Sequence, residues 1–155
     1  MSIEKLKQIE MSEIKYAKSD AEIESCWEVV QVLRPHLKKE NFLPQVQEMM
    51  LDGYQMIFIA EGDAVAAFAG FRNMNMLYGG KIIYIDDVST LPRYRGKGYA
   101  SLLLDFIHKL AKKTGMNAVH LDSGYHRNDA HRLYLNKGYK IASHHFEREV
   151  EGNSR

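Results

Sequence analysis

Hydrophobic positions near the start of the chain recur at helical spacing. Apolar side chains repeat every three or four residues from Ile23 to Leu33, which is typical of a helix that buries one face. Ser19 or Asp20 can cap this helix, and Pro35 ends or kinks it. A similar pattern predicts a second helix over residues 42–51. Both predicted helices come before the strand-rich part of the chain.

The middle of the chain switches to short apolar runs separated by turn residues, which predicts strands. Three antiparallel strands are expected in a row, followed by alternation between helices and strands. This order indicates an α/β (α+β mixed) sheet that is mostly antiparallel, with helices on both faces. The expected elements are an edge strand at 13–17, strands at 54–60, 64–74 and 82–90, a helix at 99–113, a strand at 118–122, a helix at 128–136 and a strand at 139–148.

Length and composition are those of an ordinary globular domain. The chain has 155 residues, of which 45% are apolar and 26% charged. A net charge of +1 argues against nucleic acid as a partner, because such binding needs a basic excess. The single cysteine, Cys26, excludes an internal disulfide and favours a reducing compartment. No run approaches the ~20 apolar residues of a membrane span, and the N-terminus lacks a signal-peptide core, so we expect a cytoplasmic protein without a membrane partner.

The strand that closes at Pro92 leads into a basic, glycine-containing turn and then an apolar helix. The turn reads Arg95-Gly96-Lys97-Gly98-Tyr99-Ala100. A helix start offers backbone N–H groups without partners and a partial positive charge. The two glycines open the backbone to another molecule, and Arg95 and Lys97 add full charges. The junction therefore predicts a phosphate or pyrophosphate site, with a turn of solvated basic residues as the alternative.

This turn resembles the pyrophosphate motif of the GCN5-related N-acetyltransferase (GNAT) superfamily, Q/R-x-x-G-x-G/A, with Arg95, Gly98 and Ala100 at its defined positions. Residues 127–139 resemble a second motif of that family, N-x-x-A-x-x-L-Y-x-x-x-G-F. The positions in register are Ala130, Leu133, Tyr134, Gly138 and an aromatic at Tyr139. Arg127 stands where asparagine is usual, and Asn128 follows it. The resemblance covers about residues 13–148 and implies one GNAT domain over 1–155.

The resemblance also implies an acyl donor and its site. The strands at 82–90 and 118–122 would splay apart, and acetyl-CoA would lie in the gap with its pyrophosphate on the amides of residues 95–100. Its pantetheine would pair like an extra strand with unpaired backbone groups at the strand end. The implied cofactor-binding residues are Val88, Ser89, Thr90, Arg95, Gly96, Lys97, Gly98, Tyr99, Ala100, Arg127, Asn128 and His131. No metal is expected, because no histidine or cysteine cluster has ligand spacing.

The implied reaction is attack of a primary amine on the thioester, and the protonated amine must first lose a proton. Strand alternation places Asp86 on the face of Val88 and Thr90. Asp87 then lies on the opposite face, so only one of these carboxylates faces the acceptor. The resemblance implies Asp86 as the base, directly or through a water, with an ordinary polar role as the alternative. Asp87 is expected to pair with an arginine or to hold a loop.

Tyr134 is the other candidate catalytic residue. Its position in the second motif implies a hydroxyl next to the thioester sulfur, where it would protonate the departing thiolate. The alternative is an aromatic side chain that packs its helix against the core. His131 is the histidine that would serve as an alternative base or a phosphate neighbour. A backbone N–H of residues 88–90 would stabilise the oxyanion.

Three functions are weighed on these observations. The first is an N-acetyltransferase that moves the acetyl group of acetyl-CoA to a primary amine of a small molecule or peptide through a ternary complex. The second is a catalytically weak acyl-CoA-binding sensor or partner module. The third is a nucleotide-binding domain. The sequence argues against it, because it contains neither the P-loop motif nor the glycine spacing of a Rossmann turn. Residues 130–134 also resemble the small-amine acetylators of the family, including aminoalkylphosphonate acetyltransferases. The basic residues between Arg34 and Lys39 suit an acceptor that carries an acidic group, with a solvated charged loop as the alternative. The chain is also compatible with a homodimer.

Overall fold

The computed structural model describes residue 3 and residues 13–153. In chain order the elements are β1 (Ile14–Tyr16), α2 (Asp20–Ser25), α3 (Trp27–Leu33), α4 (Lys39–Leu51), β2 (Gln55–Glu61), β3 (Ala64–Met76), β4 (Gly80–Thr90), the 3-10 turn η1 (Pro92–Tyr94), α5 (Tyr99–Lys113), β5 (Ala118–Leu121) and α6 (Asn128–Asn136). Backbone contacts group them into two compact units, one up to Leu121 and one from Asp122. The expected single domain over 1–155 stays a prediction.

The strands form one five-stranded sheet in the order β1-β2-β3-β4-β5. Neighbours from β1 to β4 pair antiparallel, and β4 and β5 pair parallel. The long hairpins β2–β3 and β3–β4 build the centre, because each return strand directly follows its partner in the sequence. The predicted mixed, mostly antiparallel sheet is confirmed.

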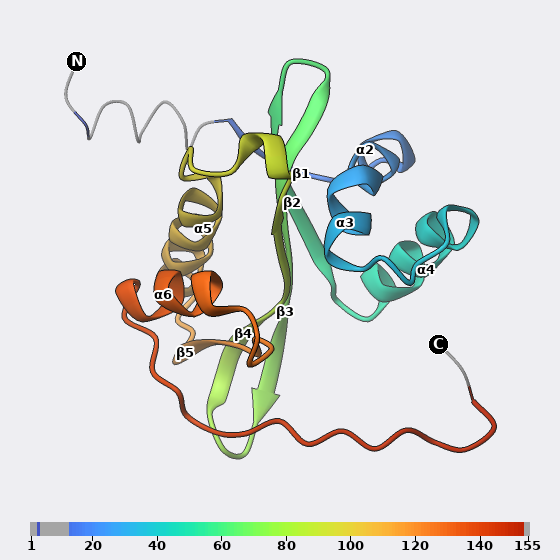
Figure 1. Cartoon of the computed structure of the whole chain (residues 1–155). Coiled ribbons are helices and arrows are strands. Elements are labelled where there is room, and N and C mark those ends of the chain that lie inside the picture. The colour runs from blue at the N-terminus through green and yellow to red at the C-terminus, as the bar shows by residue number, and fades with distance from the viewer. Residues whose placement is uncertain (1–2, 4–12, 154–155) are drawn as a thin grey trace. The chain divides into compact units, whose positions relative to one another are not determined.

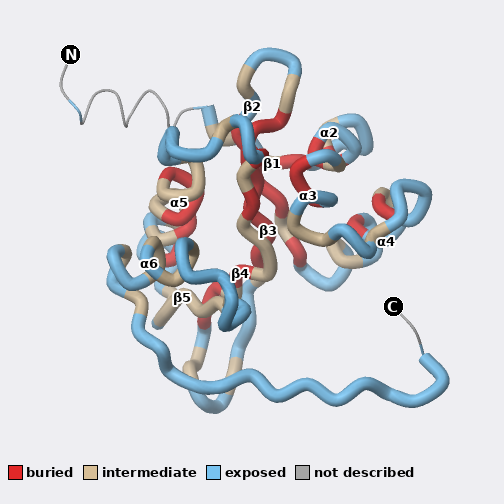
Figure 2. Tube along the Cα trace, in the orientation of Figure 1, coloured by how far each residue is buried: buried red, intermediate tan, exposed pale blue. Residues whose placement is uncertain are grey.

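Helices cover both faces of this sheet, with α5 on one side and α2, α3 and α4 on the other (Figure 1). Both α3 and α5 contact β3 and β4, the central strands. The buried positions follow the sheet and the inward stripe of α5 (Figure 2). On the side of α2–α4 the core includes Ile23, Val29, Phe42 and Phe68. Both faces of β4 are therefore packed against helices.

A β-bulge interrupts the pairing of β3 with β4. Phe71 pairs with Ile85 and Gly70 pairs with Asp87, so Asp86 is an extra residue without a partner in β3. The extra residue shifts the alternation by one position. Asp86 and Asp87 therefore lie on the same face, and the prediction that they face opposite sides is wrong.

The predicted first helix is divided at Cys26 into α2 and α3. The N–H of Cys26 bonds to the carbonyls of Ile23 and Glu24 instead of continuing the regular α-helical ladder. The predicted cap at Ser19 is confirmed: its side chain accepts from the N–H of Glu22, and the carboxylate of Glu22 accepts in turn from the N–H of Ser19. The chain leaves α3 at Arg34, one residue before Pro35, which also disfavours helical geometry at Arg34.

The strand predicted at 139–148 is not formed. These residues carry no regular structure, and the segment is exposed along almost its whole length (Figure 2). Its large apolar residues Ile141 and Phe146 are 81% and 91% exposed. A strand is stable only when its backbone pairs with another strand, and no pairing for this segment occurs in the described chain. Its alternating pattern alone was insufficient to make a strand.

No helix in the described part of the chain combines the length and the apolar character needed to cross a bilayer.

Candidate active site

The parallel pairing of β4 with β5 ends halfway along β4. The paired residues run from Ile82 and Ala118 to Ile85 and Leu121, where β5 stops. Beyond that point β4 continues to Thr90, and among the described strands it pairs there with β3 alone. The edge of Val88–Thr90 that faces away from β3 is thus left open to an extended ligand.

The open edge leads into the predicted pyrophosphate turn. After η1 the backbone adopts positive φ angles of 82° at Gly96 and 83° at Gly98, values that other residues rarely adopt. Gly98 is the N-cap of α5, and no side chain caps this helix start. A Cβ on either glycine would meet nothing within 4 Å. The glycines are therefore needed for their backbone angles, and a side chain at either position would not clash with the rest of the described chain.

Lys97 is held by an acidic residue that the sequence analysis did not identify. Its Nζ lies 2.8 Å from Oε1 of Glu61, at the end of β2. The hydroxyl of Tyr99 donates to the other oxygen of the same carboxylate. The bond from Lys97 holds the pKa of Glu61 below its usual value, with a smaller contribution from Tyr99. Arg95 and Lys97 are both exposed, and of these two only Lys97 is paired with a carboxylate in the described chain, so the charge of Arg95 is the less neutralised.

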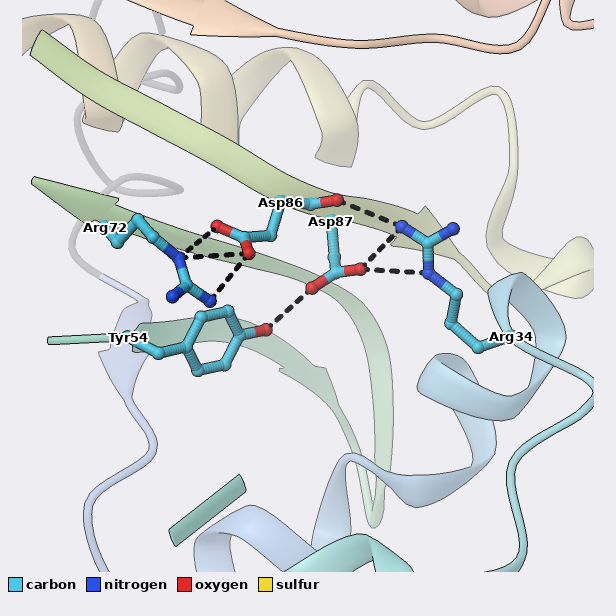
Figure 3. Close-up of polar contacts among 5 residues, drawn as sticks. All are labelled: Arg34, Tyr54, Arg72, Asp86 and Asp87. Carbon is cyan, nitrogen blue, oxygen red and sulfur yellow. Dashed lines mark hydrogen bonds and ion pairs between the residues drawn. The ribbon is translucent and has the colours of Figure 1, made fainter. Parts of the chain in front are cut away.

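The two carboxylates of the bulge are both engaged by arginines (Figure 3). Arg72, from β3, contacts both oxygens of Asp86: its Nε donates at 3.0 and 3.1 Å, and its Nη2 donates to Oδ2 at 2.8 Å. Burial raises the pKa of Asp86, and the contact with Arg72 opposes that shift. Asp86 is thus a carboxylate with increased proton affinity that is oriented by a fixed cation.

Asp87 is bound from two further elements (Figure 3). Arg34, just after α3, donates to its Oδ1 from Nε at 3.1 Å and from Nη2 at 2.8 Å. Tyr54, just before β2, donates to Oδ2 at 2.9 Å. Burial, and then the charge of Asp87, raise the pKa of Tyr54 well above its usual value, so this phenol stays a donor. The expectation that Asp87 pairs with an arginine is confirmed.

Gly70 makes this arrangement sterically possible. A Cβ on Gly70 would lie 1.7 Å from the hydroxyl oxygen of Tyr54. The phenol thus crosses the backbone of β3 to reach Asp87, the cross-strand partner of Gly70. A glycine inside a predicted strand is a known sign of such a close approach, and it was the available signal for Tyr54. Nothing comparable marked Arg72 or Arg34.

Residues 20–139, well over half of the chain, match the model of the acetyltransferase (GNAT) family. The chain belongs to this family. The predicted GNAT membership and the enzyme class, an N-acetyltransferase, are confirmed.

Relatives of this GNAT protein include enzymes with named amine substrates. It is 31% identical over 142 residues to the uncharacterized N-acetyltransferase YhdJ of Bacillus subtilis (strain 168), covering 90% of this chain and 100% of that one. It is 24% identical over 124 residues to the aminoalkylphosphonate N-acetyltransferase of Salmonella typhimurium (strain LT2), covering 79% and 80%. An aminoglycoside N-acetyltransferase in complex with CoA superposes with a TM-score of 0.76 at 13% identity, covering 89% and 93%, which confirms the GNAT fold.

The second GNAT motif forms α6 in the unit that starts at Asp122, and α6 has the predicted bounds 128–136. The ring of Tyr134 packs edge-on against Tyr139 at 5.8 Å between centroids, and burial raises the pKa of Tyr134. Nε2 of His131 lies 2.8 Å from the carbonyl oxygen of Gly124. Arg127 is the N-cap residue of α6 without a side-chain capping bond. These site residues stay predictions, and His131 already has a local partner.

Proposed function

We propose that this GNAT protein transfers the acetyl group of acetyl-CoA to a primary amine of a small molecule or peptide, by direct attack in a ternary complex. The observation that carries the proposal is the open edge of Val88–Thr90, which leads directly into the uncapped, glycine-shaped start of α5. An extended pantetheine suits the edge, and a pyrophosphate suits the helix start. Both features belong to the unit that ends at Leu121.

The donor site is assigned residue by residue from this arrangement and the motifs. Val88, Ser89 and Thr90 would pair with the pantetheine through their backbone, and a backbone N–H there would stabilise the oxyanion. The turn from Arg95 to Ala100 would bind the pyrophosphate, with the exposed Arg95 as the principal charged side chain. Arg127, Asn128 and His131 are assigned to the cofactor on their motif position alone.

The chemistry needs one proton acceptor and one proton donor. In the proposal Asp86, acting through a water, takes the proton from the amine, and the nitrogen then forms its bond to the thioester carbon. The carbon–sulfur bond breaks, and Tyr134 gives its proton to the departing thiolate; the second proton that the attacking nitrogen loses as the amide forms restores the phenol. Support for Asp86 is its raised pKa and its contact with Arg72, which fixes the carboxylate. Support for Tyr134 is its motif position and its protonated phenol.

The acceptor is assigned as a small amine or a peptide amine. The relatives named for aminoalkylphosphonates and aminoglycosides support an amine of modest size. His36, Lys38 and Lys39 are exposed, which is compatible with an acceptor that also carries an acidic group. A cytoplasmic location and a homodimer are retained as proposals.

The donor assignment is tested with two matched glycine variants. Gly98→Ala puts a Cβ at a positive φ in the turn, and Gly115→Ala does the same at 71° just after α5, again without a neighbour within 4 Å. Both substitutions impose similar backbone strain. We expect Gly98→Ala to weaken CoA binding in isothermal titration by tenfold or more, and Gly115→Ala to leave it within about twofold of the unchanged chain.

The reaction itself is tested by following free thiol with acetyl-CoA and a panel of aminophosphonates, polyamines, aminoglycosides, amino acids and peptides. Thiol release that depends on an amine supports the proposal. Failure of the unchanged chain to bind CoA, or equal loss of binding in the two glycine variants, contradicts it.

A further inference from the structure

The bulge in β4 leaves one backbone group in need of a partner. Because Asp86 has no partner in β3, its carbonyl is not placed by the β3–β4 register. A partly buried carbonyl is costly when it lacks a hydrogen bond. Nη2 of Arg34 donates to this oxygen at 3.0 Å (Figure 3). One side chain from outside the sheet thus satisfies the carbonyl of the extra residue.

The same guanidinium also binds the next side chain. Arg34 donates from Nε and Nη2 to Oδ1 of Asp87, while Oδ2 of Asp87 accepts from Tyr54. Arg34 therefore binds two consecutive residues of β4: the backbone carbonyl of Asp86 and the side-chain carboxylate of Asp87. The planar fork of an arginine can make these bonds together, and a lysine cannot.

The backbone of Arg34 is itself held in place. It follows α3 with φ −124° and ψ 68°, and its N–H bonds to the carbonyl of Val30. The next residue is Pro35, which disfavours helical geometry at Arg34. The side chain thus leaves the end of α3 toward β4 from a restricted backbone.

The bulge decides which side chains of β4 face which helical layer. Arg72 pairs with Tyr84 and Gly70 pairs with Asp87, so one face of β3 meets Tyr84 before the bulge and Asp87 after it. Val88 and Thr90 consequently point to the opposite face, on the side of α5. A loss of the bulge would shift the register by one residue and exchange these faces.

We propose that Arg34 is a positioning residue that maintains the bulge and thereby sets the open edge of Val88–Thr90 for the acyl donor. This inference rests on the proposed function. The ion pair between Arg34 and Asp87 is 41% and 14% exposed at its two side chains, so its direct contribution to stability is small. In this proposal Arg34 acts by fixing the backbone geometry of β4 just before the predicted pyrophosphate turn.

The test compares Arg34→Met and Arg34→Lys with a matched control, Arg93→Met. Arg93 also pairs with a carboxylate on α3, Glu28, at 2.8 Å, but its polar contacts within the described residues do not include Asp86 or Asp87. Two quantities are measured on the full chain: CoA affinity by isothermal titration, and amide hydrogen exchange in a peptide spanning residues 84–91. Circular dichroism establishes that each variant is folded, and Arg34→Lys provides the test if Arg34→Met is not.

We expect both Arg34 variants to bind CoA at least tenfold more weakly and to exchange the amides of residues 86–90 at least tenfold faster. Arg93→Met should change both by less than about twofold. Wild-type exchange or wild-type CoA affinity in the Arg34 variants overturns the inference. If the unchanged chain does not bind CoA, the proposed function fails, and unaltered exchange would then reject the role of Arg34 in the bulge separately.

Discussion

The hydroxyl of Tyr54 occupies the space that a side chain on Gly70 would need. The distance from this oxygen to the position of a Cβ on Gly70 is 1.7 Å, and the ring carbons would lie at 2.3 and 2.5 Å. One residue just before β2 and one in β3 thereby determine how Asp87 is held, because Tyr54 reaches this carboxylate only across a bare backbone. The relationship makes the identity of each residue depend on the other.

Gly70→Ala should therefore destabilise the protein by displacing the ring of Tyr54, by about 1–3 kcal/mol for an overpacked interior. Tyr54→Phe should not relieve the clash, because ring carbons also lie within 2.5 Å. Tyr54→Ala should relieve it, so that Gly70→Ala costs less in the Tyr54→Ala background. Urea unfolding of the single and double variants measures this coupling. Strictly additive free energies would contradict the steric explanation.

Asp86→Asn should slow catalysis by about 10²-fold or more, because the amine loses its proton acceptor. CoA affinity should change by less than about twofold. Asp63→Asn, an exposed substitution in the β2–β3 turn, is the control and should leave both quantities unchanged. Steady-state rates with an active amine and titration with CoA check the prediction. A rate for Asp86→Asn near that of the control would remove Asp86 from the mechanism.

The raised pKa of Asp86 also predicts how stability varies with pH. A carboxyl with a higher pKa in the folded chain than in the unfolded chain binds protons more readily when folded. The favourable contribution of Asp86 is therefore present at low pH, and it is lost as the pH rises from the ordinary aspartate pKa of 3.8 through the higher pKa of the folded chain. Wild-type stability relative to Asp86→Asn should fall over this range in urea unfolding experiments. A rise would mean that the contact with Arg72 outweighs burial.

Tyr134→Phe should lower kcat by about tenfold or more while leaving the KM for acetyl-CoA nearly unchanged, because the thiolate would depart without its acid. The matched control is Tyr139→Phe, since Tyr139 packs against Tyr134 and burial raises the pKa of its hydroxyl too. Steady-state kinetics with a fixed amine compare the two. Equal effects of both substitutions would indicate a packing role for Tyr134.

Cys26 should be inert toward thiol reagents in the folded chain. Its side chain is fully buried, and burial raises its pKa to about 12, so the reactive thiolate is scarce at neutral pH. A chromogenic disulfide reagent should report no protein thiol until denaturant is added, and then one per chain. Rapid reaction of the native protein would contradict this burial and would add a background to the free-thiol assay.

The sequence predicted those elements whose bounds depend on local residues. Helix α5 begins after Gly98 and α6 spans 128–136, as expected, because glycines and helix periodicity mark these ends. The row of antiparallel strands from β2 to β4 was also predicted, because short turns join these strands in the sequence. The predicted pyrophosphate turn was also recognisable, since the residues of its motif are contiguous in the sequence.

Features set by distant residues were missed. The pairing of Lys97 with Glu61 joins positions 36 residues apart, and the contact of Arg34 with Asp87 spans 53. The bulge at Asp86 depends on how β3 pairs with β4, and the residues around Asp86 carry no sequence signal for it. Simple alternation therefore assigned the wrong face to every residue of β4 after Asp86. The absent strand at 139–148 shows the same limit, because a pattern cannot supply a pairing partner.

The extra residue in β4 changes whether even-numbered or odd-numbered positions face a given side of the sheet, so the effects of substitutions should change in the same way along this one strand. Before Asp86, Tyr84 lies on the side of α2–α4; after it, the buried Ser89 does, although 84 is even and 89 is odd. A substitution scan should thus show its sensitivity on the side of α2–α4 at even positions up to 86 and at odd positions from 87. Sequence alignments of this segment should be anchored separately on each side of that point.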